Sequence, residues 1–364
     1  MIESKVKKPI KNTFHQKLSS WYEANKRNLP FRETPINPYF IWVSEIILQQ
    51  TRLEQGLPYY LKFINKYPDL QALSTANEQD ILLLWQGLGY YSRARNMHHT
   101  ARYIQIKLKG EFPNTYREIL KLKGIGPYTA AAISSIAFNE PVIALDGNVY
   151  RFLSRYFAVE ESIDEAIGKK IIQEKGQKLM PKLNPGDFNQ ALIEIGALIC
   201  KPNNPLCTEC PVSRTCKAFN QNLTGILPIR KKKNKAKTKY FYYFIVYNKK
   251  EQIIIRKREG AGIWKNMFEF PLLESEKRIA LKNIPQSDFF QNLFKKSQPV
   301  IRTISNEHKH ILSHQILKTR FIEIDVSKHS YEEKDYLKIN HEEIEQYPMP
   351  RLIHKFFQQK ELAL

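Results

Sequence analysis

The first half of the chain carries apolar residues at helical spacing, separated by residues that end helices. Apolar side chains recur every three or four positions, as at Phe14, Leu18, Trp21 and Tyr22. Glycine and proline stand between the periodic segments. The pattern predicts helices over residues 14–26, 41–48, 81–85, 93–108, 127–138, 149–156, 163–180 and 188–200.

A different pattern begins after residue 239. Residues 240–247 read YFYYFIVY, and a polar turn at 248–250 separates them from a second apolar run at 252–255. Aromatic and β-branched runs around a short polar turn favour a β-hairpin. A further strand is predicted over residues 317–324. The chain is therefore expected to combine a mainly α N-terminal region with a C-terminal α+β domain.

A basic segment divides the two halves. Seven of the ten residues from 230 to 239, RKKKNKAKTK, are lysine or arginine, and their mutual repulsion favours an extended linker. The 364 residues suffice for two domains, each with its own core. We expect an N-terminal domain over residues 1–225, a linker over 226–239 and a C-terminal domain over 240–364.

The charge balance points to a polyanionic partner. The chain has 57 lysine and arginine residues against 36 aspartate and glutamate residues, a formal net charge of +21. Such an excess favours nucleic acid, although a merely solvated basic surface is the alternative. The sequence has no apolar run of about 18 residues and no signal peptide at its start. We therefore expect a soluble monomer in the cytoplasm and no membrane partner.

All four cysteines lie close together. Cys200, Cys207, Cys210 and Cys216 have the spacing C-x6-C-x2-C-x5-C. This grouping favours metal ligation over buried free thiols, because chains of reducing compartments rarely form disulfides. The spacing matches neither the paired C-x2-C knuckles of zinc modules nor the common cluster runs. The residues alone leave zinc and an iron–sulfur cluster open.

Residues 122–130, LKGIGPYTA, predict a tight hairpin before a helix. Gly124, Ile125 and Gly126 make the turn, and Pro127 is well suited to the first helical position. Backbone N–H groups at a helix N-terminus form a ready site for a phosphate. An ordinary turn between helices is the alternative, and the basic composition favours the phosphate interpretation.

Two carboxylates are candidates for acid–base chemistry. Glu45 interrupts the apolar segment 41–48, where burial would raise its pKa and let it deliver a proton near neutral pH. Alternatively, it lies on a polar helix face beside Ser44. Asp146 precedes a predicted helix, either as a simple N-cap or as a second carboxylate kept ionised by helix N–H groups. Such a pair is suited to cleaving a glycosidic bond through an oxocarbenium-like state.

Together these motifs resemble the MutY family of adenine DNA glycosylases, in the helix-hairpin-helix superfamily that includes endonuclease III. The resemblance covers nearly the whole chain, through WVSEIILQQTR (42–52), LWQGLGYYSRARN (84–96), LKGIGPYTA, ALDGNV (144–149) and the cysteine spacing. It implies a helix-hairpin-helix fold with a [4Fe–4S] cluster in the loop 200–216. It also implies base excision repair of adenine opposite 8-oxoguanine or guanine in double-stranded DNA.

The resemblance also implies roles for individual residues. Glu45 would protonate the extruded adenine, and Asp146, supported by Asn148, would stabilise the sugar cation. Phe31 stands where many relatives have tryptophan, which exchanges one stacking surface for another. The other implied contacts are to the adenine pocket from Arg27, Leu29 and Arg32, and to the opened base stack from Gln50 and Tyr90.

Tyr128 separates two enzymatic hypotheses. Endonuclease III-like lyases resemble the chain here but carry a sugar-attacking lysine at this position, and tyrosine cannot form a Schiff base. We therefore expect a monofunctional glycosylase, with Tyr128 near the sugar or Asp146. A third hypothesis, a non-catalytic DNA-binding protein with an oxidant-sensing cysteine centre, is disfavoured by Glu45.

The C-terminal half resembles the Nudix-like module of the same family. Residues 264–271 read WKNMFEFP, but residues 274–294 lack the R-E-x-x-E-E pattern that holds magnesium in Nudix hydrolases. This half is expected to recognise the damaged base and not to hydrolyse nucleotides. Ser313 and His314 match the F-S-H loop that checks for 8-oxoguanine in relatives, whereas Leu312 replaces its aromatic residue and is expected to pack as an apolar side chain.

Overall fold

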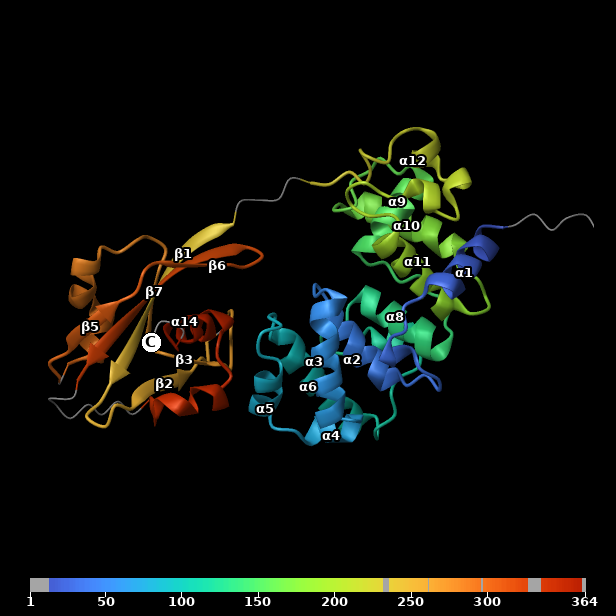
Figure 1. Cartoon of the computed structure of the whole chain (residues 1–364). Coiled ribbons are helices and arrows are strands. Elements are labelled where there is room, and N and C mark those ends of the chain that lie inside the picture. The colour runs from blue at the N-terminus through green and yellow to red at the C-terminus, as the bar shows by residue number, and fades with distance from the viewer. Residues whose placement is uncertain (1–12, 232–235, 261, 296, 327–334, 362–364) are drawn as a thin grey trace, which may run out of the picture. The chain divides into compact units, whose positions relative to one another are not determined.

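The computed structural model describes residues 13–231, 236–260, 262–295, 297–326 and 335–361 (Figure 1). The chain forms two compact units. One comprises Met1–Ser74 and His99–Lys232, and the other comprises Thr75–His98 and Lys233–Leu364. Part of the predicted linker, residues 232–235, lies outside the described residues. Among the described residues, no helix is long and apolar enough to cross a membrane.

The first unit is helical, as the periodic pattern predicts. Helix α8 has the predicted limits, and the other predicted helices begin and end within a few residues of theirs. The helices are α1 (Phe14–Asn25), α2 (Pro38–Leu48), α3 (Leu53–Lys66), α4 (Leu70–Thr75), α7 (Tyr116–Ile119), α8 (Pro127–Phe138), α9 (Gly147–Phe157), α10 (Ala166–Leu179), α11 (Pro185–Leu198) and α12 (Lys217–Asn220), with single turns η1 (Pro30–Arg32), η2 (Cys207–Glu209) and η3 (Ser213–Thr215).

Helix α3 was not predicted. Pro58 lies inside this helix, where proline normally removes a hydrogen bond and kinks the chain. Gly56, also inside α3, is buried, and a Cβ there would come within 2.7 Å of the Leu48 side chain. Close packing of α3 on α2 therefore maintains a helix that local propensity does not favour.

Close packing also joins α11 to the start of α9. A Cβ on Gly196 would lie 2.8 Å from the Cβ of Asn148 and 2.9 Å from its backbone. Val149, Phe152 and Ile195 belong to the apolar core that these helices share. The glycine thus fixes the first turn of α9, which follows Asp146, directly against α11.

The second unit contains a mixed sheet, together with helices α5 (Glu78–Leu84) and the start of α6 (Ser92–Lys107). The strand order is β3-β2-β1-β7-β5, and β1 and β7 run parallel over their whole lengths. The antiparallel pairing of β1 with β2 confirms the predicted hairpin. The strands are β1 (Lys237–Tyr247), β2 (Ile253–Lys257), β3 (Phe268–Glu269), β4 (Leu272–Ser275), β5 (Val300–Ile304), β6 (His308–Ile311), β7 (Gln315–Asp325) and β8 (Leu337–Ile339).

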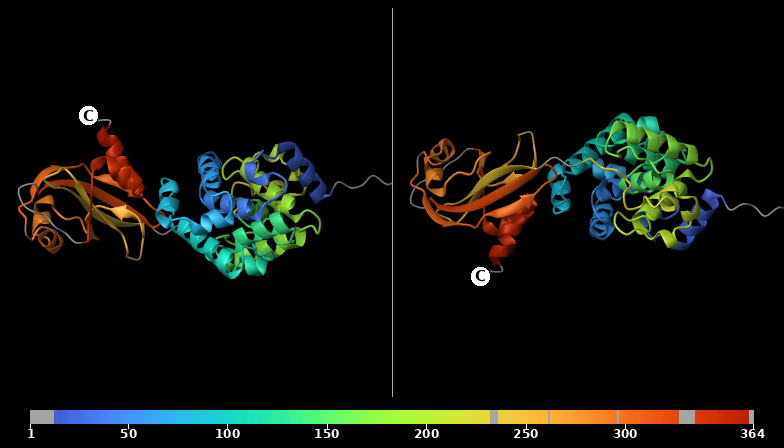
Figure 2. Two further views of the ribbon diagram at one scale, coloured as in Figure 1. Left: turned by 90° about the horizontal axis from the view of Figure 1, so that it is seen from below. Right: turned by 90° about the horizontal axis from the view of Figure 1, so that it is seen from above.

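Alternating side chains of β1 serve two cores. Phe241 and Tyr243 pack with α14 (Arg351–Glu361) on one face, whereas Tyr242 and Phe244 pack with α13 (Asp288–Leu293) on the other. Figure 2 shows α14 and α13 on opposite sides of the sheet. Because both faces are covered, β1 is apolar on both, which explains its unbroken aromatic sequence. The remaining turns are η4 (Leu281–Gln286) and η5 (His341–Gln346).

Strand β1 begins earlier than predicted. The sequence pattern placed its start at residue 240 and assigned residues 237–239 to the linker, but Lys237 pairs with Gln315 and Lys239 with Leu317. A lysine-rich end is accommodated because these residues are exposed or only partly buried. Lys237 N–H also donates to the carbonyl of His314 at 3.1 Å, which connects β1 to the predicted lesion-contacting turn.

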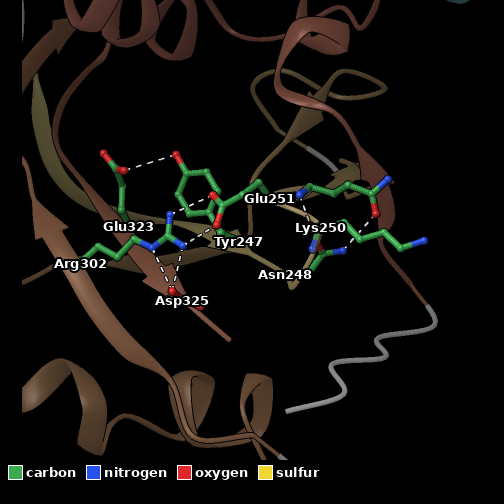
Figure 3. Close-up of polar contacts among 8 residues, drawn as sticks. Tyr247, Asn248, Lys250, Glu251, Arg302, Glu323 and Asp325 are labelled. Carbon is green, nitrogen blue, oxygen red and sulfur yellow. Dashed lines mark hydrogen bonds and ion pairs between the residues drawn. The ribbon is translucent and has the colours of Figure 1, made fainter. Parts of the chain in front are cut away.

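An ionic cluster joins the strands at the end of the sheet where β7 finishes (Figure 3). Arg302 of β5 donates to Glu251 and to Asp325, each at 2.8 Å, and its guanidinium lies 4.6 Å from the ring centroid of Tyr247. Glu251 belongs to the β1–β2 turn and Asp325 ends β7. The cluster therefore connects three neighbouring strands and their turn through one guanidinium.

Candidate active site

A cavity of about 1080 Å³ in the first unit brings together all four predicted catalytic residues and some of the predicted substrate contacts. We call it the active-site cavity. Its wall is formed by the segment around η1, by α2, by the hairpin and α8, and by α9 and α11. The predicted residues that line it are Arg27, Leu29, Phe31, Arg32, Glu45, Gln50, Gly124, Gly126, Tyr128, Asp146 and Asn148.

Glu45 projects from α2 into this cavity. Its helix is otherwise buried and apolar, and begins at the Asn37 cap and Pro38. Burial, with a smaller contribution from the nearby Asp146, raises the pKa of Glu45 from 4.5 to about 7. A hydrogen bond from Tyr128 and the charge of Arg32 act in the opposite direction. The carboxyl is thus poised to give up a proton near neutral pH.

Tyr128 lies in the first turn of α8, and its hydroxyl forms a hydrogen bond with the side chain of Glu45. Burial, together with the charges of Glu45 and Asp146, raises the pKa of Tyr128 well above 10. The phenol therefore stays protonated and can only donate to the carboxylate. The Tyr128 hydroxyl therefore holds Glu45 in place, and a tyrosine offers no amine that could attack the sugar.

Asp146 is the N-cap of α9. Its carboxylate accepts a hydrogen bond from Val149 N at 2.7 Å and another from Asn148 Nδ2 at 2.8 Å. These bonds lower its pKa, as the N-cap interpretation predicts, but burial outweighs them and the net direction is upward. The site therefore holds two carboxyls with raised pKa values, each within electrostatic reach of Tyr128.

Arg151 connects Asp146 to the cysteine segment and was not predicted. It is buried, and its Nη2 donates to Asn148 Oδ1 at 2.9 Å and to Gly196 O at 2.6 Å. Its Nε donates to the carbonyl of Cys200 at 2.7 Å. A continuous chain of bonds thus runs from Asp146 through Asn148 and Arg151 to Cys200. An arginine at a core position of an amphipathic helix is the sequence signal that points to it.

Glu194 is the second residue that was not predicted. Its fully buried carboxylate accepts from Arg27 Nε at 2.9 Å and from Arg32 Nη1 at 2.9 Å. One carboxylate of α11 therefore orients both predicted pocket arginines. The signal was an acid inside the apolar run ALIEIGAL, the same signal that singled out Glu45.

The hairpin places exposed backbone at the start of α8. Gly124 has a φ of 83°, which favours glycine, and Ile125 is buried whereas both glycines are exposed. Gly126 is the N-cap of α8, Pro127 follows in the first turn, and no side chain caps the helix. Thr100 Oγ1 donates to the carbonyl of Lys123 at 2.8 Å, which fixes the start of the turn.

The residues predicted to contact the opened base stack and the lesion lie in exposed turns. Gln50 and Tyr90 both have positive φ values and are exposed. In the second unit, the hydroxyls of Tyr90 and Ser313 form a hydrogen bond. Ser313 and His314 are the exposed central residues of a turn closed by Leu312 N and Gln315 O at 2.8 Å. His314 is thus at a turn, whereas the residues alone would make it an ordinary strand-edge histidine.

Leu312 packs as an apolar side chain, as the sequence predicts. Its side chain is partly buried and packs against the apolar core that includes Phe241 and α14. It therefore acts as an apolar anchor below the exposed Ser313, as predicted.

The four cysteines line a common cavity with Arg155 and Phe152. Arg155 is 3% exposed, and its Nη1 donates to Cys200 Sγ at 3.4 Å. Burial raises the pKa of Cys210 to about 12, so a thiolate there needs a compensating cation. Among the described residues, no three acidic, histidine or cysteine side chains converge on a single metal-ion position.

Comparisons with known proteins agree with this geometry. Residues 43–182 match the HhH-GPD superfamily of base excision DNA repair proteins, and residues 242–359 match the NUDIX domain. The adenine DNA glycosylase of Buchnera aphidicola subsp. Baizongia pistaciae is 40% identical over 317 residues, which cover 86% of this chain and 87% of that protein. The human adenine DNA glycosylase is 40% identical over 213 residues, 56% of this chain and 39% of that protein.

A solved structure shares the fold of the helical part. The structure of a thermostable thymine-DNA glycosylase aligns with a TM-score of 0.52 and 28% identity, and covers 57% of this chain and 95% of its own. Membership in a family of enzymes excludes the non-catalytic DNA-binding hypothesis. The cavity with its two carboxyls and the similarity to these relatives lead to the same conclusion. The chain belongs to the adenine DNA glycosylases of the HhH-GPD superfamily and is a base excision repair N-glycosylase that acts on DNA.

Proposed function

We propose that the protein removes adenine paired with 8-oxoguanine or guanine by hydrolysis, without cleaving the strand. The observation that carries this proposal is the Glu45 carboxyl, with a pKa of about 7, in a cavity that also contains Tyr128 and Asp146. A protonated carboxyl and a second carboxylate are the groups needed to break an N-glycosidic bond.

In this mechanism Glu45 donates its proton to N7 of the extruded adenine, which makes the base a better leaving group. The glycosidic bond breaks, and its electron pair leaves with the base. Asp146 faces the oxocarbenium ion that forms, and Asn148 orients Asp146 through its 2.8 Å bond. Glu45, now ionised, accepts a proton from the water that adds to the sugar.

The side chain of Tyr128 supports the monofunctional assignment. Tyr128 occupies the position at which related lyases carry a lysine, and its phenol is bonded to Glu45. Lysine, unlike tyrosine, can attack the sugar to form an imine. Any strand cleavage would therefore be weak and due to another amine.

Substrate contacts follow from the lining and the exposed turns. Arg27, Leu29 and Arg32 bind the adenine, whereas the turn residues Gln50 and Tyr90 fill the opened base stack. Extruding a base costs a few kcal/mol, and less at a mispair, which contributes to selectivity. The exposed residues Ser313 and His314 bind 8-oxoguanine, and the N–H groups from Gly124 to Gly126, around Ile125, bind a phosphate.

We further propose that Cys200, Cys207, Cys210 and Cys216 hold a [4Fe–4S] cluster. The four cysteines line one cavity, and their C-x6-C-x2-C-x5-C spacing is part of the resemblance to the family in which such a run holds this cluster. When bound, the cluster would cross-link the loop 200–216 and would take part in no redox step. Arg155 would offset the negative charge of the cluster, and Arg151 would connect the loop to Asn148 through its bonds to the Cys200 carbonyl and Asn148 Oδ1.

The protein is proposed to act as a cytoplasmic monomer, with an N-terminal glycosylase domain, a linker and a lesion-recognition domain that begins with β1 at Lys237. Single-turnover cleavage of duplexes with adenine opposite 8-oxoguanine, guanine or thymine tests the function. Breaks that appear at the mispaired adenine only after alkali support it. Breaks without alkali would revive the lyase hypothesis, and no product from any duplex would contradict the proposal.

A further inference from the structure

A second chamber, of about 750 Å³, adjoins the active-site cavity within the first unit. It lies among the end of α1, the η1 segment, the end of α8 and the start of α11. Five residues line both spaces and therefore form the partition between them, namely Arg27, Leu29, Arg32, Ile136 and Gln190.

Two salt bridges hold this partition in place. Glu194 accepts from Arg27 Nε and Arg32 Nη1, each at 2.9 Å. Arg32 Nε is buried, and no described residue accepts a hydrogen bond from it. The Arg27 side chain is 34% exposed, so its guanidinium can leave Glu194 while Arg32 keeps that carboxylate paired.

The second chamber has the chemistry of a purine site. Asn28, Asp187 and Lys26 line it without lining the active-site cavity, and Ile36 and Ile136 add apolar surface. A free purine offers ring-nitrogen acceptors and an exocyclic amine donor, which amides, carboxylates and guanidiniums satisfy. A volume of 750 Å³ is within the range of small-molecule sites, about 300–1,000 Å³.

We propose that the second chamber takes up the free adenine after excision and releases it while the duplex remains bound. This inference rests on the proposed function. The residues expected to face DNA, Gln50, Gly124 and Gly126, line the active-site cavity only, so bound duplex closes that side. The excised base then lies between the DNA and the partition. Arg32 Nε, without an acceptor in the described chain, can bind a ring nitrogen of the base as it passes.

Ala137 provides the test, because it lines the second chamber and not the active-site cavity. Ala137→Trp would fill the chamber with an indole. Ile36→Trp does the same from another segment and keeps the test valid if the first variant fails to fold. Ala166→Trp is the matched control, since Ala166 is exposed on α10 and lines neither space.

The assay uses the full-length, cluster-loaded protein on an immobilised duplex with radiolabelled adenine opposite 8-oxoguanine. Bond cleavage, base in the supernatant and DNA dissociation are followed in parallel. In the wild type and in Ala166→Trp, we expect the base to leave before the DNA. In Ala137→Trp, cleavage should stay within about twofold of wild type, whereas base release should slow about tenfold or more, toward the rate of DNA dissociation.

Several results would overturn the inference. Wild-type base that leaves only together with the DNA excludes a separate exit, as does unchanged release in both tryptophan variants. The cations Lys26, Arg27 and Arg32 also suit an anion, so inorganic phosphate that slows release as strongly as free adenine would exclude a purine site. A wild-type protein that excises no adenine would instead refute the proposed function itself, which separates the two failures.

Discussion

Glu45→Gln is expected to slow excision by about 10²–10⁴ while making the protein more stable. Burial and the nearby Asp146 disfavour the ionised form of the Glu45 carboxyl, which is why its pKa is raised from 4.5 to about 7. Glutamine keeps the shape and can accept the hydrogen bond of Tyr128 without carrying charge. The substitution therefore removes a destabilising charge together with the catalytic proton.

The magnitude follows from the pKa. A carboxyl whose folded-state pKa is raised binds its proton more tightly when folded, so its contribution is favourable at low pH and is lost between about pH 4.5 and 7. At about 1.4 kcal/mol per pKa unit, ionised Glu45 costs about 3 kcal/mol at pH 8 and about 1 kcal/mol at pH 5. For a helical unit of this size, the gain at pH 8 corresponds to about 6–12 °C in Tm.

The assay is thermal unfolding followed by circular dichroism at pH 5 and pH 8, for wild type, Glu45→Gln and a control. Glu160→Gln serves as the control because Glu160 is exposed. The control should change Tm little at either pH. The reasoning would be refuted if Glu45→Gln were no more stable than wild type at pH 8, or if its gain were the same at both pH values.

Four further substitutions test other parts of the site. Tyr128→Lys should gain strand cleavage through an imine, which borohydride trapping detects, and no trapped product would contradict the positional assignment. Arg151→Met removes the donor to Asn148 and Cys200, and should lower the single-turnover rate about 10–100-fold at wild-type iron content. Arg155→Met should lower the iron content, read from visible absorbance. Full retention of iron would show that Arg155 is not needed to stabilise the cysteine site. Ser313→Ala should reduce the preference for 8-oxoguanine over guanine, and an unchanged ratio would exclude Ser313 as the lesion contact.

Hydrophobic periodicity predicted most helices of the first unit and the β1–β2 hairpin, because these elements bury one regular face or run. It did not predict α3, where Pro58 and Gly56 are tolerated only through packing against α2. It also placed the start of β1 three residues late, since a lysine-rich strand end has the composition of a linker. Local composition therefore fails where long-range pairing decides the structure.

The site shows a similar division. An acid in an apolar helix identified Glu45, and the same signal was overlooked at Glu194, whose role depends on two arginines far away in the sequence. Arg151 was missed because its partners, Asn148, Gly196 and Cys200, meet only once α9 packs on α11. The net upward shift of the pKa of Asp146 was likewise unpredictable, because it reflects how deeply the folded chain buries an N-cap.

The most direct test of the acid mechanism is the single-turnover rate of adenine excision opposite 8-oxoguanine as a function of pH, in wild type and Glu45→Gln. The protonated form of Glu45 is the active one, so the wild-type rate should fall about tenfold per pH unit above a pKa near 7. Glu45→Gln should be slower by about 10²–10⁴ and should lose this dependence. A rate that continues to rise above pH 7, or a glutamine variant that keeps wild-type activity, would contradict Glu45 as the proton donor.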